Sequence, residues 1–309
     1  MTASTHESQT PRPTRQWAAQ DTSTDRVASA LRRLLHEAEH SHGRHVSSRT
    51  LNLVVGPGET KMLGAARQEV VALHPARMVL LVEHQPNRLD AEVQIHTVAV
   101  PNTHLRLLVE DIEVAGNRDR LVHLQSLLAP LLARGIPTAA WLPGFDHGPI
   151  EQSLARTADV TIFDSDLDPD PGRALLFAYA TALNHPTRDL AWLRTARWRS
   201  RISATFATTE ALGTLAFRPS AEIIGNVQQP AAILLAAWVA SRVHINVSLR
   251  QGSGADPVEA VTVAGIVINA GSGSLCDEST LAAALDTLYA APLGYETALA
   301  ALDRVAILA

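Results

Sequence analysis

The sequence predicts an α/β fold, with an N-terminal three-layer α/β domain that has a largely parallel or mixed sheet, followed by a smaller α+β domain. Three observations lead to this prediction. Short apolar runs alternate with amphipathic segments over the first 170 residues, which is typical of strands and helices in a largely parallel sheet. That regularity ends at Pro171. The 309 residues, 46% of them hydrophobic, are enough for two domains.

The first domain is expected over residues 25–170. Residues 1–24 are rich in Ser, Thr, Gln and Pro, and we expect a disordered tail there. Residues 27–36 predict a short amphipathic helix, and a linker rich in His and Ser follows over 40–48. The further expected strands are 50–55, 77–82, 91–98, 105–114, 137–142 and 159–163. The further expected helices are 59–73, 118–133 and 150–157.

The second domain is expected over residues 171–309, with helices and strands mixed along the chain. The expected helices are 172–183, 187–206, 231–242 and an interrupted one over 280–308. The expected strands are 214–224, 243–249 and 260–268. We expect the last two strands to form a hairpin, because Gly, Ser and Asp in the stretch between them suit a loop.

Composition excludes several classes of protein. The formal net charge of −5 argues against a general nucleic-acid binder. Residues 1–25 lack the apolar run of a signal peptide, and no apolar stretch is long enough to span a bilayer. Cys276 is the only cysteine, which excludes an intramolecular disulfide and a thiolate zinc site. We therefore expect a cytoplasmic protein with no nucleic-acid or membrane partner, no metal and no cofactor.

Arginines and tryptophans gather in the expected helix 187–206, although aromatic residues make up only 4% of the chain. Arg194, Arg197 and Arg201 follow three- and four-residue spacing along one side, and Trp198 lies among them. A basic stripe is usually a solvated face, but a tryptophan among arginines favours a contact surface. We therefore predict that these four residues bind a partner.

Trp192 and Arg199 fall on the opposite, apolar side of the same expected helix. A guanidinium there needs a carboxylate or an anionic ligand, since a buried unpaired charge is very costly. Trp192 and Arg199 are therefore expected to hold the domain together or to pair with an anion, and both alternatives stay open.

Trp141 and Phe145 lie at or just after the carboxyl end of an expected parallel strand. Open α/β sheets bind ligands at that edge. Exposed aromatic side chains would suit a protein contact, whereas a tryptophan packed under the next helix is equally compatible with the pattern. We include both residues among the partner-binding candidates.

Asp164 and Asp166 are the best candidates for catalysis. They follow an expected buried strand in the order D-x-D, which is typical of the nucleophile loop of haloacid dehalogenase-like phosphatases. Asp168 stands where that family has Thr or Val, and the pair closes its domain instead of opening it. An acidic loop that caps the next helix is the alternative. A phosphate-ester or sugar-phosphate enzyme, or an anion sensor that uses Arg199 or the turn Gly271–Ser274, therefore remains the rival function.

Five motifs occur in a consistent order: R-T-L-N-L-V (Arg49–Val54), H-P-A-R (His74–Arg77), W-L-P-G (Trp141–Gly144), A-D-V-T-I-F-D-S (Ala158–Ser165) and D-L-A-W-L-R-T-A-R-W-R (Asp189–Arg199). Together they resemble the glucose-6-phosphate dehydrogenase assembly protein family, OpcA, over residues 25–250. The Arg- and Ala-rich composition is similar to that of the actinobacterial branch. Cyanobacterial members are tied to thioredoxin through cysteines, and a chain with Cys276 alone could form only an intermolecular disulfide.

The resemblance implies a protein that is not an enzyme and has no catalytic residues. It implies that the chain binds glucose-6-phosphate dehydrogenase, promotes assembly of the active oligomer and activates it allosterically. The chain would then regulate NADPH supply at the entry of the oxidative pentose phosphate pathway. The stoichiometry, the interface, the strand order, the binding of a small anion and a homo-oligomer all stay open at this point.

Overall fold

The computed structural model describes residues 15–40, 44–46, 50–57, 76–99, 105–144, 148–254, 256–269, 277–288 and 294–308. It divides into two compact units, unit 1 (Met1–Asp159) and unit 2 (Val160–Ala309). The expected helix 59–73, Phe145, the turn Gly271–Ser274 and Cys276 lie outside the described residues.

Unit 1 is built on a mixed sheet with the strand order β1-β5-β6-β4-β3-β7, and β2 pairs with β6. The parallel pairs are β3 with β4, β3 with β7, and β4 with β6, whereas β5 runs antiparallel to β1 and to β6. This confirms the predicted α/β class with a mixed sheet. The strands are β1 (Arg15–Ala19), β2 (Arg44–Val46), β3 (Leu51–Val55), β4 (Ala76–Glu83), β5 (Leu89–Ala99), β6 (Leu105–Gly116) and β7 (Thr138–Leu142).

The central strands of this sheet are buried, as near-continuous apolar runs predict. Every residue of β3 and β7 is buried. Arg77 of β4 is buried too, and it lies opposite Glu110 of β6 in the parallel register. Its Nε donates to the Glu110 carboxylate at 2.5 Å, and its guanidinium also donates to the Leu131 carbonyl at 2.7 Å. The buried charge is therefore paired, as its burial requires.

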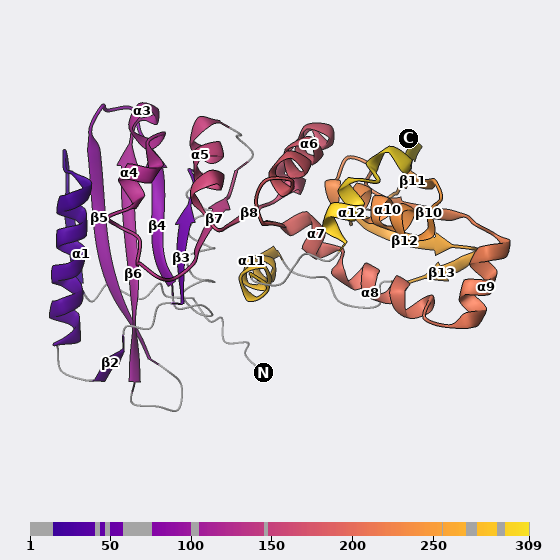
Figure 1. Cartoon of the computed structure of the whole chain (residues 1–309), viewed down its shortest axis with the longest axis horizontal. Coiled ribbons are helices and arrows are strands. Elements are labelled where there is room, and N and C mark those ends of the chain that lie inside the picture. The colour runs from indigo at the N-terminus through magenta and orange to yellow at the C-terminus, as the bar shows by residue number, and fades with distance from the viewer. Residues whose placement is uncertain are drawn as a thin grey trace, which may run out of the picture. The chain divides into compact units, whose positions relative to one another are not determined.

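Residues 15–19 form strand β1, so the predicted disordered tail over 1–24 is wrong for these residues. β1 pairs with β5 from Arg15 opposite Ile95 to Ala19 opposite Ala91. Helix α1 (Thr24–Glu39) follows and lies beside β5 (Figure 1), with its apolar side buried. A polar composition did not prevent strand formation because the edge of β5 offers backbone partners that a local pattern cannot reveal.

The other helices of unit 1 are short: α3 (Arg118–Leu121), α4 (Leu124–Leu128) and α5 (Pro149–Thr157). The prediction of a single helix over 118–133 is therefore wrong, because the helix is interrupted between Leu121 and Leu124. The side chain of Asn117 caps the first piece by accepting from the Arg120 amide at 3.2 Å.

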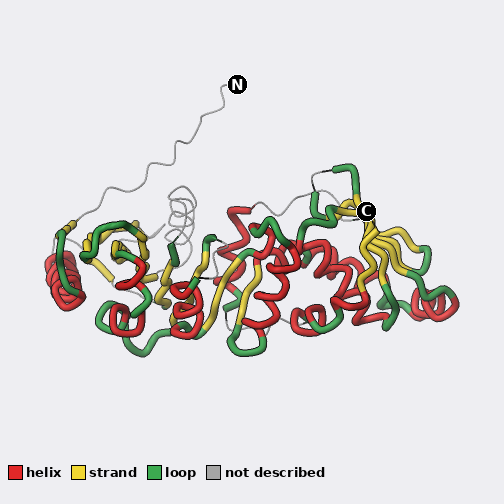
Figure 2. The backbone as a smooth tube through the Cα atoms, turned by 90° about the horizontal axis from the view of Figure 1, so that it is seen from above, coloured by secondary structure: helices red, strands yellow, loops and turns green. Residues whose placement is uncertain are grey.

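Unit 2 contains a five-stranded sheet with the order β13-β12-β10-β11-β14, seen as adjacent yellow strands in Figure 2. Its strands are β10 (Ala221–Gly225), β11 (Val247–Gln251), β12 (Val258–Val263), β13 (Ile266–Ile268) and β14 (Val305–Leu308). β10 lies between β11 and β12, so the expected hairpin of those two strands is wrong. β12 instead forms a hairpin with β13 across Ala264 and Gly265, which have the positive φ angles of a tight hairpin turn.

The helix α10 (Pro230–Val243) forms the core of unit 2. All of its residues from Pro230 to Ala240 are buried, and it packs against β10, β11, β14 and α12 (Tyr295–Leu299). Two further expectations are wrong nearby. A strand was expected over 214–224, but residues 214–217 belong to helix α9 (Thr209–Phe217) and only the end of that range forms a strand, β10. β14 replaces the end of the expected C-terminal helix. Across the described ranges, no helix has the length and apolar character needed to cross a membrane.

Two parallel strands, β8 (Val160–Phe163) and β9 (Thr187–Asp189), begin unit 2. The connection between them contains the 3-10 turn η1 (Ser165–Leu167) and helix α6 (Pro171–Ala182). After β9 come α7 (Leu190–Arg194) and α8 (Ala196–Thr205), so the single helix expected over 187–206 is interrupted at Thr195. The remaining elements are α11 (Asp277–Asp286) and η2 (Leu302–Arg304).

Candidate functional site

Three acidic residues, Asp164, Asp166 and Asp189, meet in the interior of unit 2 after the carboxyl ends of β8 and β9. The two strands are parallel and Phe163 lies opposite Asp189, so their ends lie together. Asp164 and Asp189 are buried. Buried carboxylates need cations or hydrogen-bond donors, and the surrounding elements supply both.

Arg194 of α7 neutralises two of these carboxylates. One guanidinium nitrogen donates to Asp164 Oδ1 at 2.7 Å and to Asp166 Oδ2 at 3.0 Å, and a second donates to Asp164 Oδ2. This bidentate fork is the strong form of an arginine–carboxylate pair. The Arg194 side chain is only 16% exposed, so its predicted place on an outer basic stripe is wrong. The reason is the break at Thr195, which separates α7 from α8 and interrupts the predicted spacing.

Asp189 accepts hydrogen bonds from four donors. They are the Ser165 amide at 3.1 Å, the Ser165 hydroxyl at 2.8 Å, the Ala191 amide at 3.0 Å and the Tyr295 hydroxyl at 2.9 Å. These donors come from η1, α7 and α12, so one carboxylate ties three elements together. Burial raises the pKa of Asp189 to about 7, the negative charge of Asp164 adds to the rise, and the bonds from Ser165 oppose it.

Asp166 joins the cluster to the core helix. Its Oδ1 accepts from the Ala231 amide in the first turn of α10 at 2.9 Å, where a helix favours a negative charge. Burial raises the pKa of Asp166 to about 6, and the neighbouring Asp164 charge contributes in the same direction. The Ala231 amide and Arg194 act against this rise.

This geometry does not suit the phosphatase chemistry that the D-x-D order suggested. Both Asp164 oxygens are held by Arg194, and the two Asp166 oxygens are held by Ala231 and Arg194. A carboxylate nucleophile needs an oxygen that can reach phosphorus. Within the described ranges there is also no group of three or more His, Cys, Asp or Glu side chains that could hold a metal ion. The arrangement favours the alternative interpretation, in which the acidic loop caps helices and joins elements.

Arg199 and Trp192 form a second internal contact. The Arg199 guanidinium lies 3.5 Å from the centroid of the Trp192 ring, donates to Thr195 Oγ1 at 3.1 Å and donates to the Trp192 carbonyl at 3.3 Å. No carboxylate among the described residues pairs with it. A cation–π contact and the carboxyl-terminal end of α7 take the place of the expected anion. Burial lowers the pKa of Arg199 to about 10.

The two tryptophans proposed as exposed contacts are buried. Trp141 lies in β7, opposite Val55 of β3, within a strand that is buried along its whole length. Trp198 of α8 is 7% exposed. The predicted exposure of Trp198 is therefore wrong, and for Trp141 the burial favours the alternative of a packed tryptophan. Burial of this kind depends on neighbouring elements that the local pattern does not report.

Of the predicted contact residues that the structure describes, Arg201 is exposed and Arg197 is half-buried. Arg201 donates to the Asn269 carbonyl at 3.0 Å, next to the end of β13. Sequence reasoning missed the exposed apolar residues near it: Leu212 and Phe217 of α9 and Val267 of β13. Phe217 is 89% exposed.

These residues lie on neighbouring elements. α8 packs against β13, and the Ala264 amide donates to the Ser220 carbonyl at 2.7 Å, which places the β12–β13 turn beside the end of α9. We call the set Arg201, Leu212, Phe217 and Val267 the α8–α9 surface. It combines aliphatic, aromatic and arginine side chains, the last two being enriched at protein interfaces.

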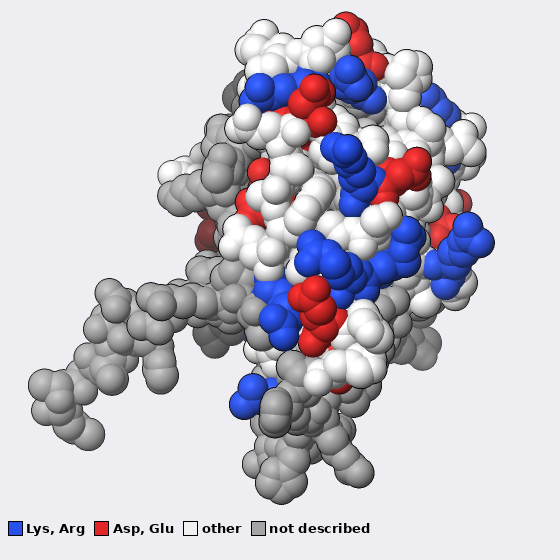
Figure 3. Space-filling model, turned by 90° about the vertical axis from the view of Figure 1, so that its left-hand side faces the viewer, with Lys and Arg blue, Asp and Glu red and all other residues white. Residues whose placement is uncertain are grey.

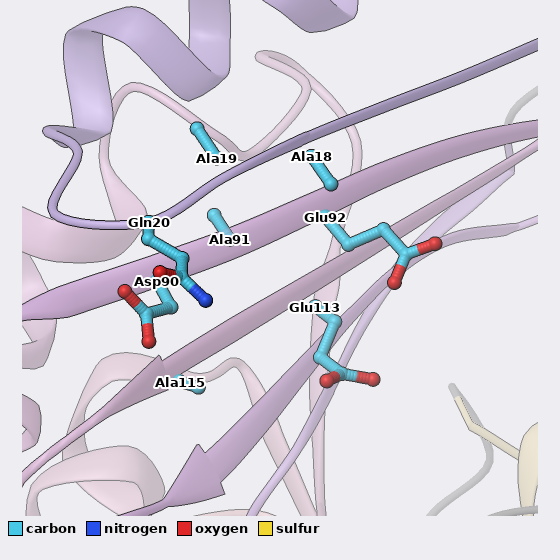
Figure 4. Close-up of a pocket in the computed structure, with 8 residues that line it drawn as sticks. All are labelled: Ala18, Ala19, Gln20, Asp90, Ala91, Glu92, Glu113 and Ala115. Carbon is cyan, nitrogen blue, oxygen red and sulfur yellow. The ribbon is translucent and has the colours of Figure 1, made fainter.

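Unit 1 presents charged surfaces of a different kind. The side that α1 covers carries grouped arginines beside acidic residues (Figure 3), and Arg33 pairs with Glu37 at 3.2 Å. A hollow of about 320 Å³ between β1, β5 and β6 is lined by Asp90, Glu92 and Glu113 (Figure 4). Asp90 is held by the Asp21 amide and by Arg88, which lower its pKa. Neither surface contains a buried, convergent set of catalytic groups.

Comparison with known proteins gives two family matches. A family model described as the glucose-6-phosphate dehydrogenase subunit N-terminal domain matches residues 67–181, and one described as the C-terminal domain of that subunit matches residues 185–285. The chain is therefore a two-domain protein of the class that these models define. It belongs to the OpcA family of glucose-6-phosphate dehydrogenase assembly proteins.

Other comparisons add little. No curated protein matches the sequence. A solved E. coli structure described as "Trehalose-6-phosphate from E. coli bound with UDP-2-fluoro glucose" aligns with a TM-score of 0.26 and 9% identity. The alignment covers 65% of this chain and 64% of that chain, so the chain spans less than two thirds of that protein. A likeness this low carries no argument about fold or function.

The buried cluster draws on both family matches. Asp164 and Asp166 belong to the first matched region, whereas Asp189, Arg194 and Ala231 belong to the second. All five residues lie inside unit 2. The motifs A-D-V-T-I-F-D-S and D-L-A-W-L-R-T-A-R-W-R therefore supply residues to one internal junction of this unit.

Proposed function

We propose that this chain is a non-enzymatic assembly factor and allosteric activator of glucose-6-phosphate dehydrogenase, and that it acts in the cytoplasm within the oxidative pentose phosphate pathway. Family membership over residues 67–181 and 185–285 is the observation that carries the proposal. The interior supports the non-enzymatic part, because its clustered carboxylates are occupied by Arg194, Tyr295 and backbone amides.

Activation sets a physical requirement on binding. A partner shifts an equilibrium only by as much as it prefers the competent state over the incompetent one. Moving a dehydrogenase from mostly incompetent to mostly competent, from 1:99 to 99:1, needs about a 10⁴-fold preference. A preference of this size needs a contact with well-packed anchors, which a diffuse charged face does not supply.

The α8–α9 surface is our proposed contact with the dehydrogenase. It includes Arg201, one of the partner-binding residues predicted from the sequence. Arg197, another of them, lies on the same helix. The surface adds Phe217, which is 89% exposed and whose ring would lose most of its contact with water in a complex. Trp141, Arg194 and Trp198 are not part of the proposed contact, because their side chains are used inside the units.

The test is the activity of glucose-6-phosphate dehydrogenase from the same organism with and without this chain, with complex formation followed by size-exclusion chromatography. We expect a co-eluting complex with raised activity. The double variant Arg201→Ala with Phe217→Ala should weaken both. The matched control is Arg304→Ala with Ile307→Ala, which removes an exposed arginine and an exposed apolar side chain elsewhere in unit 2.

Two outcomes would redirect the proposal. If the control variant loses the complex and the Arg201–Phe217 variant keeps it, the contact lies elsewhere. If no complex and no activation appear under both reducing and oxidising conditions, the activator function is wrong for this chain. Magnesium-dependent turnover of a generic phosphate ester that Asp164→Asn abolishes would then favour an enzyme. A raised melting temperature with a sugar phosphate would favour an anion sensor.

A further inference from the structure

A row of exposed apolar side chains runs along α6. Leu176 is 69% exposed, Tyr179 is 40% exposed, and Leu183, at the carboxyl-terminal cap of the helix, is 67% exposed. Spacings of three, four and seven residues place these side chains on one face, with exposed Ala180 between them. Leu167 of η1, which packs against α6, is also exposed. Among the described residues, four large exposed apolar side chains therefore lie on α6, its cap and the η1 turn that packs against it.

The other side of α6 is apolar as well, and it is buried in unit 2. Its buried residues are Ala174, Leu175, Ala178 and Thr181. Arg173 is the only charged residue of the helix, and it pairs with Asp168 at 2.6 Å near the first turn. A helix that is apolar all round is normally covered on every side. An exposed apolar patch of this kind marks a contact surface.

We propose that the row Leu176, Tyr179, Ala180 and Leu183 is the contact face of a weak homodimer, in which α6 packs antiparallel against α6 of a second copy. The spacing of the row is the same when read in either direction, with a leucine at each end and Tyr179 and Ala180 in the middle. In an antiparallel pair centred between residues 179 and 180, each Leu176 faces Leu183 of the second copy. Each Tyr179 faces the small Ala180, which leaves room for the ring.

This self-complementarity is what a two-fold axis requires, because the same patch must serve on both copies. The row contains no charged side chain, so two copies meet without like-charge repulsion. One helix face from each copy is small compared with the roughly 1,200–2,000 Å² that stable interfaces bury. The dimer is therefore expected to depend on protein concentration.

Register-specific cross-linking tests the geometry. In a Cys276→Ser background, Leu176→Cys and Leu183→Cys are prepared as separate proteins and oxidised alone or after mixing. The antiparallel pair brings residue 176 of one copy to residue 183 of the other, so the mixture should cross-link. Each protein alone should cross-link far less, because equivalent residues are then about 10 Å apart along the helix. That exceeds the roughly 7 Å that a disulfide spans between Cα atoms.

Sedimentation velocity over a range of concentrations tests the association itself. We expect reversible dimerisation that Leu176→Ser with Leu183→Ser weakens by about tenfold or more, since both substitutions remove apolar surface that the contact would bury. The melting temperature should be retained because both side chains are exposed. The control Leu212→Ser changes an exposed leucine on α9 and should leave dimerisation unchanged.

Two results would overturn the inference. One is a monomer at every concentration with no cross-linking in the mixture. The other is cross-linking of each single-cysteine protein alone that equals or exceeds that of the mixture. If the double serine variant changes only the complex with the dehydrogenase, α6 contacts that enzyme and the homodimer is wrong. The cross-linking and sedimentation experiments use the chain alone, so their failure is separate from a failure of the proposed function.

Discussion

Replacing Arg194 by alanine should destabilise unit 2 strongly, although the sequence suggested an exposed residue. Arg194 donates to both oxygens of Asp164 and to Asp166, and its side chain is 16% exposed. Removing one partner of a buried ion pair costs about 3–5 kcal/mol, because the other charge stays buried without compensation. Partial exposure places the expected loss in the free energy of unfolding near the lower end, about 3 kcal/mol.

Urea unfolding followed by tryptophan fluorescence measures this loss, because Trp192, Trp198 and Trp238 lie in unit 2 and are buried. With a slope of about 2 kcal/mol per molar urea, a loss of about 3 kcal/mol lowers the midpoint by about 1.5 M. Arg201→Ala is the matched control, since Arg201 is exposed and forms no ion pair with the described residues, so its loss should change stability by less than about 0.5 kcal/mol.

The pH dependence of stability and a second substitution test whether the loss comes from buried carboxylates that no longer have a cationic partner. Arg194 opposes the raised pKa of Asp166, so without Arg194 this pKa should rise further, and protonation of Asp166 should remove part of the uncompensated charge. The Arg194→Ala defect should therefore be smaller near pH 5 than near pH 8. Adding Asp164→Asn to Arg194→Ala should recover part of the loss, because the buried charge is then absent. A midpoint for Arg194→Ala that matches the Arg201→Ala control would refute the reasoning.

Three further predictions follow from the same contacts. The pKa values of Asp166 and Asp189 are raised to about 6 and about 7, so folded unit 2 keeps protons that the unfolded chain has released. Its free energy of unfolding should therefore fall as pH rises from about 4 to about 7. Asp189→Asn should flatten the upper part of that profile. A free energy of unfolding that rises with pH over this range in the wild-type chain would contradict the prediction. Tyr295→Phe removes a buried donor to Asp189 and should cost about 1–3 kcal/mol in urea unfolding, whereas no change would mean that Asp189 does not need this bond. Removing residues 1–20 should lower the melting temperature more than removing residues 1–14, because only the longer deletion removes β1; equal values would show that the strand does not stabilise unit 1.

Local sequence patterns predicted the strands that are buried along their whole length. The apolar runs at Leu51–Val55, Thr138–Leu142 and Val160–Phe163 are strands, close to the expected ranges. The family motifs identified the family, because several weak patterns in a consistent order are specific together. The acidic loop after β8 was also found from the sequence, together with the alternative that it caps helices.

Tertiary structure alone decided how those residues are used. Tyr295 and Asp189 are 106 positions apart, and Arg194 and Asp164 are 30 apart, so no local window could pair them. A single interruption at Thr195 turned Arg194 inward and divided the helix on which the predicted basic stripe depended. Periodicity reports which side of a segment is apolar. Whether a polar or aromatic side chain is buried depends on distant segments that pack against it, and these become known only from the fold.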